Sequence, residues 1–317
     1  MMYAKQFIAL LTLVSLACSP ISTDAADWQL DTVEGAGGVP IATADTGNRD
    51  GVPVVLLHGL SGSLYDWHHQ LNSAALGDIA RLIAVDLRGH GASGKPWAIS
   101  DYESADFAED LAAVMRAKKL CKPILVGWSY GGRVITSYVR HFGTGGLSGI
   151  IFVAGPISFD PKTQSALMRS PKGSKGRSKQ PAADPVVTAA MHNSLDWARQ
   201  VTERYVATPL DEVSRDIVLA SHLATPRYVR RAIFANLRPV DELARAIVIP
   251  TAFIHGKKDV IIPVARSLAN AAVLGTNAVI QYEGVGHSPP LEIPAQFNQD
   301  LVTSISRMQQ QPCPSPG

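Results

Sequence analysis

The sequence has 317 residues, of which 46% are hydrophobic and 18% are charged, and its formal net charge is +2. A chain of this length can bury a substantial core, in one large α/β domain or in two smaller ones. The small net charge gives no electrostatic reason to expect nucleic acid as a partner.

The first residues have the pattern of an export signal. Lys5 is followed by an apolar stretch at 7–17 and by a small-residue pattern that ends at Ala25. This predicts a signal peptide over 1–26, and therefore a periplasmic or secreted protein. The alternative is lipoprotein processing at Cys18, which would leave a lipid anchor, because the residues before it loosely resemble a lipobox. No apolar run has the length of a transmembrane segment.

Apolar runs that alternate with helical patterns follow in chain order. Residues 28–33 and 39–44 are expected to form an antiparallel pair, because a glycine-rich stretch separates them. Further strands are expected at 53–57, 81–85, 124–126, 149–153, 249–254 and 278–282. Helices are expected at 107–115, 130–141, 264–273 and 294–308. Strands that alternate with helices predict a mostly parallel sheet with right-handed crossovers.

The alternation breaks after the sixth predicted strand. Residues 160–185 combine lysine and arginine with proline, serine and glycine, which predicts a flexible surface loop. Several short helices are expected after it. We interpret 158–240 as a helical lid inserted over the sheet. The core would then comprise 27–157 and 241–308, followed by a ragged tail at 309–317.

A Gly-x-Ser-x-Gly motif at residues 127–131 places Ser129 between a predicted strand and a helix that opens at Tyr130. The order of strand, tight turn and helix is typical of a nucleophile elbow, in which a strained turn exposes the serine hydroxyl. The start of the helix would direct free N–H groups at charge that develops beside Ser129. The alternative is a chance occurrence of a common motif.

A serine hydroxyl needs a general base, and the base needs an acceptor that orients it. Asp259 follows the predicted strand at 249–254, and His287 follows the strand at 278–282. Because the carboxyl ends of parallel strands meet at one edge of a sheet, Ser129, Asp259 and His287 are expected to lie close together.

Five motifs occur in order: His58-Gly59, D-x-R-G-x-G-x-S at 86–93, G-x-S-x-G at 127–131, 255–259, and Gly286-His287. Together with the chain order Ser, Asp, His, this pattern resembles the α/β-hydrolase fold superfamily. The nearest likeness is to its bacterial esterase, haloperoxidase-like and epoxide-hydrolase-like branches. The resemblance covers roughly 52–156 and 249–297. It implies a mostly parallel eight-stranded sheet flanked by helices.

The resemblance also implies roles for individual residues. Ser129 would attack a carbonyl carbon, His287 would take its proton and pass it to the leaving group, and Asp259 would hold the imidazole. The backbone N–H groups of Leu60 and Tyr130 would form the oxyanion hole.

Asp160 is a rival for the acid, because some members of this fold place it after the strand that precedes the lid. Asp259 is preferred because it follows the penultimate strand within a recognisable motif. Ser129 argues against epoxide hydrolysis and dehalogenation, since enzymes of this fold that catalyse those reactions carry aspartate there.

Other residues of the motifs are interpreted as structural. His58 and His255 are expected to brace turns. Trp128 would either wall a substrate pocket or pack beneath the lid. His68 and His69 are expected to point apart on a helix, and no cluster of carboxylates or cysteines accompanies them in the sequence. We therefore expect neither a metal nor another cofactor.

Cys121 and Cys313 remain after removal of the signal, and an even number of cysteines in an oxidising compartment predicts a disulfide. In the expected fold, Cys121 lies at the amino edge of the elbow strand, and the last helix runs towards the same edge before Cys313. The alternative is two unrelated thiols.

The sequence thus predicts a serine hydrolase that cleaves small-molecule carboxylic esters through an acyl-enzyme. One alternative is an enzyme that uses the same residues on an amide or a carbon–carbon bond, or as a perhydrolase. The other is a ligand-binding protein that retains the fold with little turnover.

Overall fold

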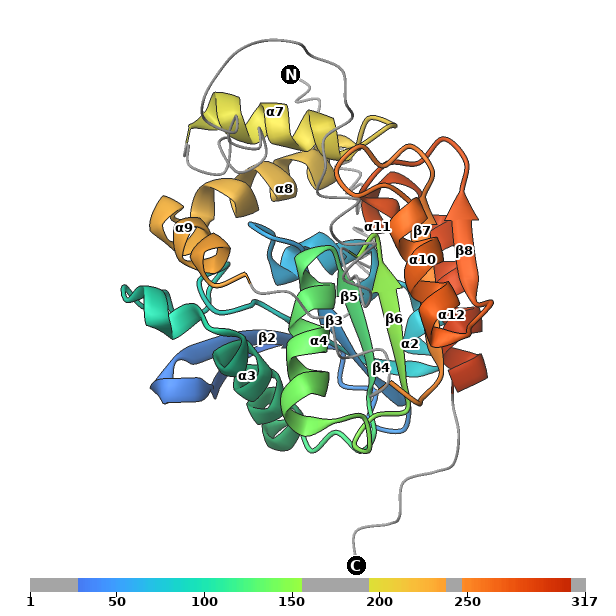
Figure 1. Ribbon diagram of the computed structural model, residues 1–317, viewed down its shortest axis with the longest axis horizontal. Coiled ribbons are helices and arrows are strands. Elements are labelled where there is room, and N and C mark those ends of the chain that lie inside the picture. Colours follow the sequence, from blue (N-terminus) through green and yellow to red (C-terminus); the bar gives the residue numbers. More distant parts are fainter. Residues whose placement is uncertain (1–27, 156–193, 238–246, 309–317) are drawn as a thin grey trace, which may run out of the picture.

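The computed structural model describes residues 28–155, 194–237 and 247–308 (Figure 1). Its strands are β1 (Gln29–Glu34), β2 (Pro40–Asp45), β3 (Val52–Leu57), β4 (Ala80–Val85), β5 (Ile124–Trp128), β6 (Gly149–Val153), β7 (Thr251–Gly256) and β8 (Val279–Tyr282). They form one sheet in the order β1-β2-β4-β3-β5-β6-β7-β8. β2 pairs antiparallel with β1 and β4, and the other neighbours are parallel. The prediction of a mostly parallel eight-stranded sheet is confirmed.

Helices cover both faces of this sheet. They are α1 (His68–Leu71), α2 (Ala74–Gly77), α3 (Ser104–Ala117), α4 (Tyr130–Phe142), α10 (Ala265–Leu274), α11 (Pro289–Glu292) and α12 (Pro294–Met308). Short 3-10 helices occur at Ala36–Gly38, Leu64–Trp67 and Ile99–Tyr102. The short helices α2 and α11 were not predicted, because segments of four residues are too short to show a helical period.

The central strands are apolar because both of their faces are buried. Along β3, Val54 and Leu56 belong to the core that contains residues of α2 and α12, whereas Val55 and Leu57 belong to the core with α3, α4 and α10. This alternation follows from the two-residue period of a strand. The sheet therefore forms a rigid layer whose carboxyl edge can hold side chains in fixed positions.

Three helices, α7 (Leu195–Tyr205), α8 (Glu212–Ala224) and α9 (Arg227–Ala235), lie above one edge of the sheet (Figure 1). We call these three helices the lid. They fall within the segment predicted as an insertion, 158–240. The predicted basic loop at 160–185, the signal peptide, Cys18 and the tail at 309–317 lie outside the described residues.

Ser194 and Asp211 begin two of the lid helices. The Ser194 side chain accepts a hydrogen bond from the N–H of Trp197, and the Asp211 side chain accepts one from Ser214. Such N-caps satisfy N–H groups that have no partner inside a helix. The caps therefore fix where α7 and α8 start.

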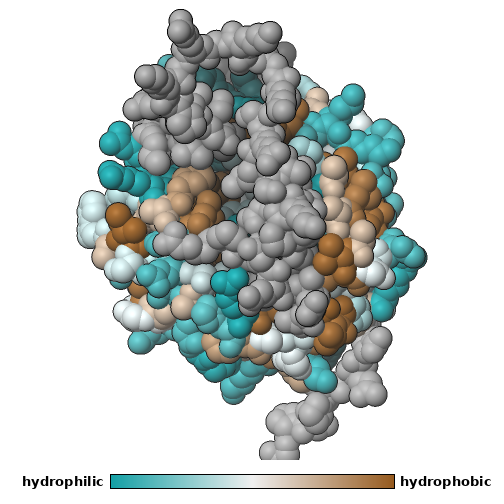
Figure 2. Space-filling view, in the orientation of Figure 1, coloured by the Kyte–Doolittle hydropathy of each residue, from teal (hydrophilic) through white to brown (hydrophobic). Residues whose placement is uncertain are grey.

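The surface of the core carries some exposed apolar side chains. Figure 2 shows apolar surface in the region of α10, where Leu268 and Val273 are 41% and 46% exposed. Within the part of the chain that the structure describes, no helix has the length and apolar character needed to cross a membrane.

Cys121 lies just before β5, at the amino edge of that strand, and it is disulfide-bonded. Its predicted partner, Cys313, lies outside the described residues, so the pairing of these two cysteines stays a prediction.

Candidate active site

Ser129 lies on the turn between β5 and α4 and has a strained backbone. Its φ and ψ are 51° and −115°, a conformation that is rare for a residue with a side chain. Glycine is required on both sides: a Cβ at Gly127 would lie 2.6 Å from the backbone nitrogen of Gly132, and a Cβ at Gly131 would collide with the carbonyl oxygen of Leu57. The elbow predicted from the motif thus has the close strand–helix contact that the motif requires.

The structure brings the three predicted side chains into one hydrogen-bonded line. His287 Nε2 lies 2.9 Å from Ser129 Oγ, and His287 Nδ1 lies 2.7 Å from Asp259 Oδ2. Asp259 follows β7 and His287 follows β8, so both come from the same edge of the sheet as Ser129. With Nδ1–H donating to the carboxylate, Nε2 is left to accept the serine proton.

Asp259 is buried and accepts four hydrogen bonds. Oδ1 accepts from the backbone N–H groups of Ile261 and Ile262, both at 2.8 Å. Oδ2 accepts from His287 and from His255 Nε2, the latter at 2.9 Å. Burial alone would raise the pKa of Asp259, but the electrostatic interaction with His287 and the hydrogen bonds from both histidines hold that pKa well below its usual range. The carboxyl group therefore stays ionised.

His255 has a closer connection to the site than the expected structural role suggested. Its ring is fully buried, and Nδ1 accepts a hydrogen bond from Ser267 Oγ at 2.8 Å. Nε2–H is shared between Asp259 and the carbonyl oxygen of Ile262, at 2.9 and 2.8 Å. Both partners of Nε2 are acceptors, so Nε2 carries the proton, and the Ser267 hydroxyl donates to Nδ1. His255 therefore orients the carboxylate as well as the turn.

The backbone of His287 is held from two sides. Its N–H donates to the carbonyl oxygen of Tyr205 at 2.7 Å, and its carbonyl oxygen accepts from Trp128 Nε1 at 2.7 Å. The Tyr205 ring also meets the imidazole edge-on, with ring centroids 5.2 Å apart. His287 is therefore held by the end of α7 above it and by the core below it.

The interpretation of Trp128 as a pocket wall is wrong. Its side chain is 3% exposed and packs edge-on against Trp67, with ring centroids 6.4 Å apart. Trp128 continues the alternation of Ile124 and Val126, which places all three in the core that contains α12. Its functional contact is the hydrogen bond to the His287 backbone.

Leu60 and Tyr130 occupy positions suited to an oxyanion hole. Tyr130 is the first residue of α4, so its N–H has no acceptor within the helix. A Cβ at Gly59 would lie 3.3 Å from Ser129 Cβ, which shows how closely the turn before Leu60 approaches Ser129. His58 braces this turn, because Nδ1 donates to the Gly59 carbonyl oxygen at 2.7 Å while Nε2 accepts from the N–H of Leu87 at 3.0 Å.

The D-x-R-G-x-G-x-S motif at residues 86–93 stabilises the loops near the turn that contains His58 and Leu60. Asp86 accepts hydrogen bonds from the N–H groups of Leu64 and Ala92, at 2.6 and 2.7 Å. Arg88 makes two hydrogen bonds to the carboxylate of Asp110, at 2.6 and 2.7 Å. These residues are buried and hold loops together, as expected.

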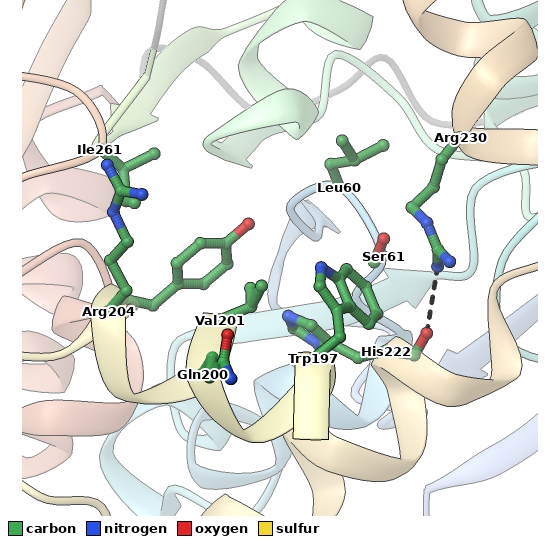
Figure 3. A pocket seen from close by; sticks show the side chains of 10 residues that line it. Leu60, Ser61, Trp197, Gln200, Val201, Arg204, His222, Arg230 and Ile261 are labelled. Carbon is green, nitrogen blue, oxygen red and sulfur yellow. Dashed lines mark hydrogen bonds between the residues drawn. The ribbon is translucent and has the colours of Figure 1, made fainter. Parts of the chain in front are cut away.

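A cavity of about 150 Å³ lies between the lid and this edge of the sheet (Figure 3). Trp197 and Val201 point from α7 towards Leu60, while Ile261 lines another part of the wall. Tyr205 also lines the cavity and contacts the His287 ring, whereas Ser129 and His287 do not line this cavity themselves. An apolar cavity of similar volume holds benzene in another protein.

Arg230 stabilises the lid at the far side of the cavity. Its guanidinium group lies 4.4 Å from the centroid of the Trp197 ring and donates to the carbonyl oxygens of His222 and Thr225, at 3.2 and 2.6 Å. Burial lowers the pKa of Arg230 to about 10. Burial likewise lowers the pKa of His222 to about 4. At neutral pH the cavity wall therefore carries a charged Arg230 and a neutral His222.

The expectation that His68 and His69 point apart is wrong. Their rings lie next to each other, tilted by 37° with centroids 3.9 Å apart, and their Nε2 atoms lie 3.3 and 3.0 Å from Ser214 Oγ on α8. The shared hydroxyl of the lid draws both rings to one side. Across residues 28–155, 194–237 and 247–308, no three His, Cys, Asp or Glu side chains are arranged to hold a metal ion.

Sequence reasoning assigned no role to Tyr205 or Glu292, although both contact the loop that carries His287. Glu292 lies close to His287 in the sequence, which is the one signal that could have drawn attention to it. The rival acid, Asp160, lies outside the described residues.

Known proteins share this architecture along most of the chain. The family model for the alpha/beta hydrolase fold matches residues 52–294. A non-heme chloroperoxidase from Streptomyces lividans is 26% identical over 285 residues, covering 87% of this chain and 99% of that protein. A bifunctional esterase/perhydrolase from Acinetobacter calcoaceticus is 25% identical over 281 residues, covering 84% and 96%. The crystal structure of an esterase from Rhodococcus sp. is 28% identical with a TM-score of 0.71, covering 88% and 99%. The protein therefore belongs to the α/β-hydrolase fold family.

Proposed function

We propose that the protein is a serine hydrolase that cleaves small-molecule carboxylic esters through an acyl-enzyme. The observation that carries this proposal is the line from Ser129 Oγ through His287 to Asp259, with bonds of 2.9 and 2.7 Å. A binding protein would not need a strained serine, a base and an ionised acid joined by hydrogen bonds. The esterase from Rhodococcus sp. supports the same reaction class.

In the first half of the reaction, Ser129 Oγ attacks the carbonyl carbon of the ester while His287 Nε2 takes the hydroxyl proton. The N–H groups of Leu60 and Tyr130 stabilise the oxygen that becomes negative. Asp259 stabilises the imidazolium ion that forms. The carbon–oxygen bond to the alcohol then breaks, and His287 passes its proton to the leaving alkoxide.

In the second half, His287 removes a proton from water, and the hydroxide oxygen attacks the acyl carbon bound to Ser129. The second tetrahedral intermediate uses the same two N–H groups. The bond to Ser129 Oγ breaks, His287 returns a proton to that oxygen, and the carboxylic acid leaves. No redox step is required.

Perhydrolysis is a second candidate, because relatives are named as a chloroperoxidase and as an esterase/perhydrolase. In that reaction hydrogen peroxide replaces water in the attack on the acyl-enzyme and gives a peracid. The ratio of peracid to acid formed from one ester in the presence of peroxide separates the two reactions.

A fluorophosphonate probe tests the shared first half of both reactions. We expect stoichiometric labelling of the peptide that contains Ser129, and protection by a slowly hydrolysed ester. Absence of labelling in the folded protein, together with no turnover of activated esters, would remove the proposal.

A further inference from the structure

The Glu292 carboxylate lies where the loop that carries His287 meets the chain that follows α7. Oε1 accepts from the backbone N–H groups of Gly286 and Ser288, both at 3.0 Å. Oε2 accepts from those of Ala207 and Thr208, at 2.8 and 3.1 Å, and is also 3.0 Å from the nitrogen of Gly286. One carboxylate therefore collects four N–H groups from two segments that are distant in the sequence.

The two segments are also in direct backbone contact. The N–H of His287 donates to the carbonyl oxygen of Tyr205 at 2.7 Å. A Cβ at Gly286 would lie 2.7 Å from the nitrogen of Ala207 and 2.9 Å from the same carbonyl oxygen, so no side chain fits between them. A shift of either segment must move the other or break these bonds.

The loop before His287 needs such a restraint. Gly284 has a φ of 72°, and Gly286 adds a second flexible position, so the backbone of this turn is intrinsically free to move. Hydrogen bonds to an ionised carboxylate are shorter and stronger than neutral ones. Glu292 supplies four of them next to His287 without touching its ring.

We propose that Glu292 is a positioning residue that couples the base of the lid, residues 205–208, to His287. Tyr205, which forms part of the cavity wall, and the general base His287 then reach their reactive positions together. This inference rests on the proposed function, because it assigns Glu292 to the same reaction. It also means that a shift of residues 205–208 away from Glu292 would disturb the loop that carries His287.

The test compares Glu292→Gln with Glu283→Gln. The first substitution keeps the size of the side chain but replaces one acceptor oxygen with an NH₂ group that cannot accept an N–H donor. The second makes the same change nearby, at a side chain that is 80% exposed and pairs only with Lys257 in the described part of the chain. For each variant, kcat and KM are measured on an activated ester, and hydrogen exchange is measured by mass spectrometry.

We expect Glu292→Gln to lower kcat by about 10- to 100-fold, with a smaller change in KM, because a displacement of the base by about 1 Å has effects of that size. Exchange should rise together in peptides covering 205–208 and 284–288. Glu283→Gln should match the wild type in both measurements. If Glu292 only capped α11, thermal stability would fall while kcat and exchange near residues 205–208 stayed unchanged, which would overturn the proposal.

If Glu292→Gln does not fold, exchange in the wild-type protein decides. The amides of Ala207, Thr208, Gly286 and Ser288 should then open with a common free energy, and independent opening would contradict the coupling. Failure of the proposed function looks different: the wild type would neither turn over esters nor react with the fluorophosphonate probe. An active wild type beside a fully active Glu292→Gln variant would remove the coupling alone.

Discussion

His255 Nε2 and His287 Nδ1 donate to the same oxygen of Asp259, at 2.9 and 2.7 Å. The carboxylate that orients the base is thus itself oriented by a second histidine, whose ring is anchored by the Ser267 hydroxyl. Such outer contacts fix a site because each partner restricts the rotamer of the next. The acid of the proposed mechanism is therefore part of a network and not an isolated side chain.

Replacing His255 with phenylalanine keeps a buried ring and removes these hydrogen bonds. A hydrogen bond to a charged group contributes about 1.5–3 kcal/mol, so we expect kcat/KM to fall by about 10- to 100-fold. Steady-state kinetics on an activated ester checks this, with thermal unfolding measured in parallel. His141→Phe, a change near the end of α4, provides the control and should behave as the wild type. Equal activity of both variants would show that Asp259 does not need the second donor.

Removing the nucleophile or the base should nearly eliminate turnover. In a comparable hydrolase, loss of either residue costs about 10⁶-fold in kcat, so we expect Ser129→Ala and His287→Ala to approach the uncatalysed rate. Circular dichroism and thermal unfolding should show folded proteins. Ser137→Ala, which removes a hydroxyl from α4, the helix that follows Ser129, should retain activity. Substantial turnover by the Ser129→Ala variant would contradict the proposed nucleophile.

Asp66 should make the folded protein less stable as the pH rises. Burial raises the pKa of Asp66 to about 8, with a further contribution from Asp86. Because the folded-state pKa lies above the unfolded value of about 3.9, the folded state binds more protons, and stability is lost between about pH 4 and pH 8. Asp66→Asn should remove this loss. Chemical unfolding at pH 5 and pH 8 measures the difference, and equal pH dependence in both proteins would contradict the assignment.

The cavity should limit the size of one half of the substrate. Val201→Phe places a ring in a space of about 150 Å³, so we expect hexanoyl or benzoyl esters to lose at least about tenfold in kcat/KM while acetyl esters change little. Val213→Phe makes the same substitution at a lid position that is 62% exposed, and it should not alter the preference. A uniform loss across all esters would show that this cavity does not receive the variable group.

Much of the architecture could be predicted because its causes are local in the sequence. Apolar runs such as 53–57 and 149–153 identify strands buried on both faces, and the Gly-x-Ser-x-Gly motif fixes a turn through steric contact alone. The chain order of Ser129, Asp259 and His287 then suggests a shared edge of the sheet. Each of these features can be recognised from neighbouring residues, or from the expectation of a parallel sheet.

The remaining features depend on contacts between the lid and the core. The close approach of the His68 and His69 rings depends on Ser214, which contacts both from α8. The role of Glu292 depends on backbone N–H groups of Ala207 and Thr208. No periodicity records such pairings, because they are formed only when segments distant in the chain pack together. The face of the sheet on which the Trp128 side chain lies could have been inferred from the alternation along β5. That alternation is a stronger signal than the position of Trp128 next to Ser129.

The positive φ of Ser129 has a consequence for how this protein can change. Glycine would adopt that conformation with less strain, so the residue that best suits the backbone of this turn lacks a hydroxyl group. Selection for thermodynamic stability alone would accordingly favour replacement of Ser129, and only selection for turnover would retain it. Reactivity and robustness are opposed at this one position of the backbone.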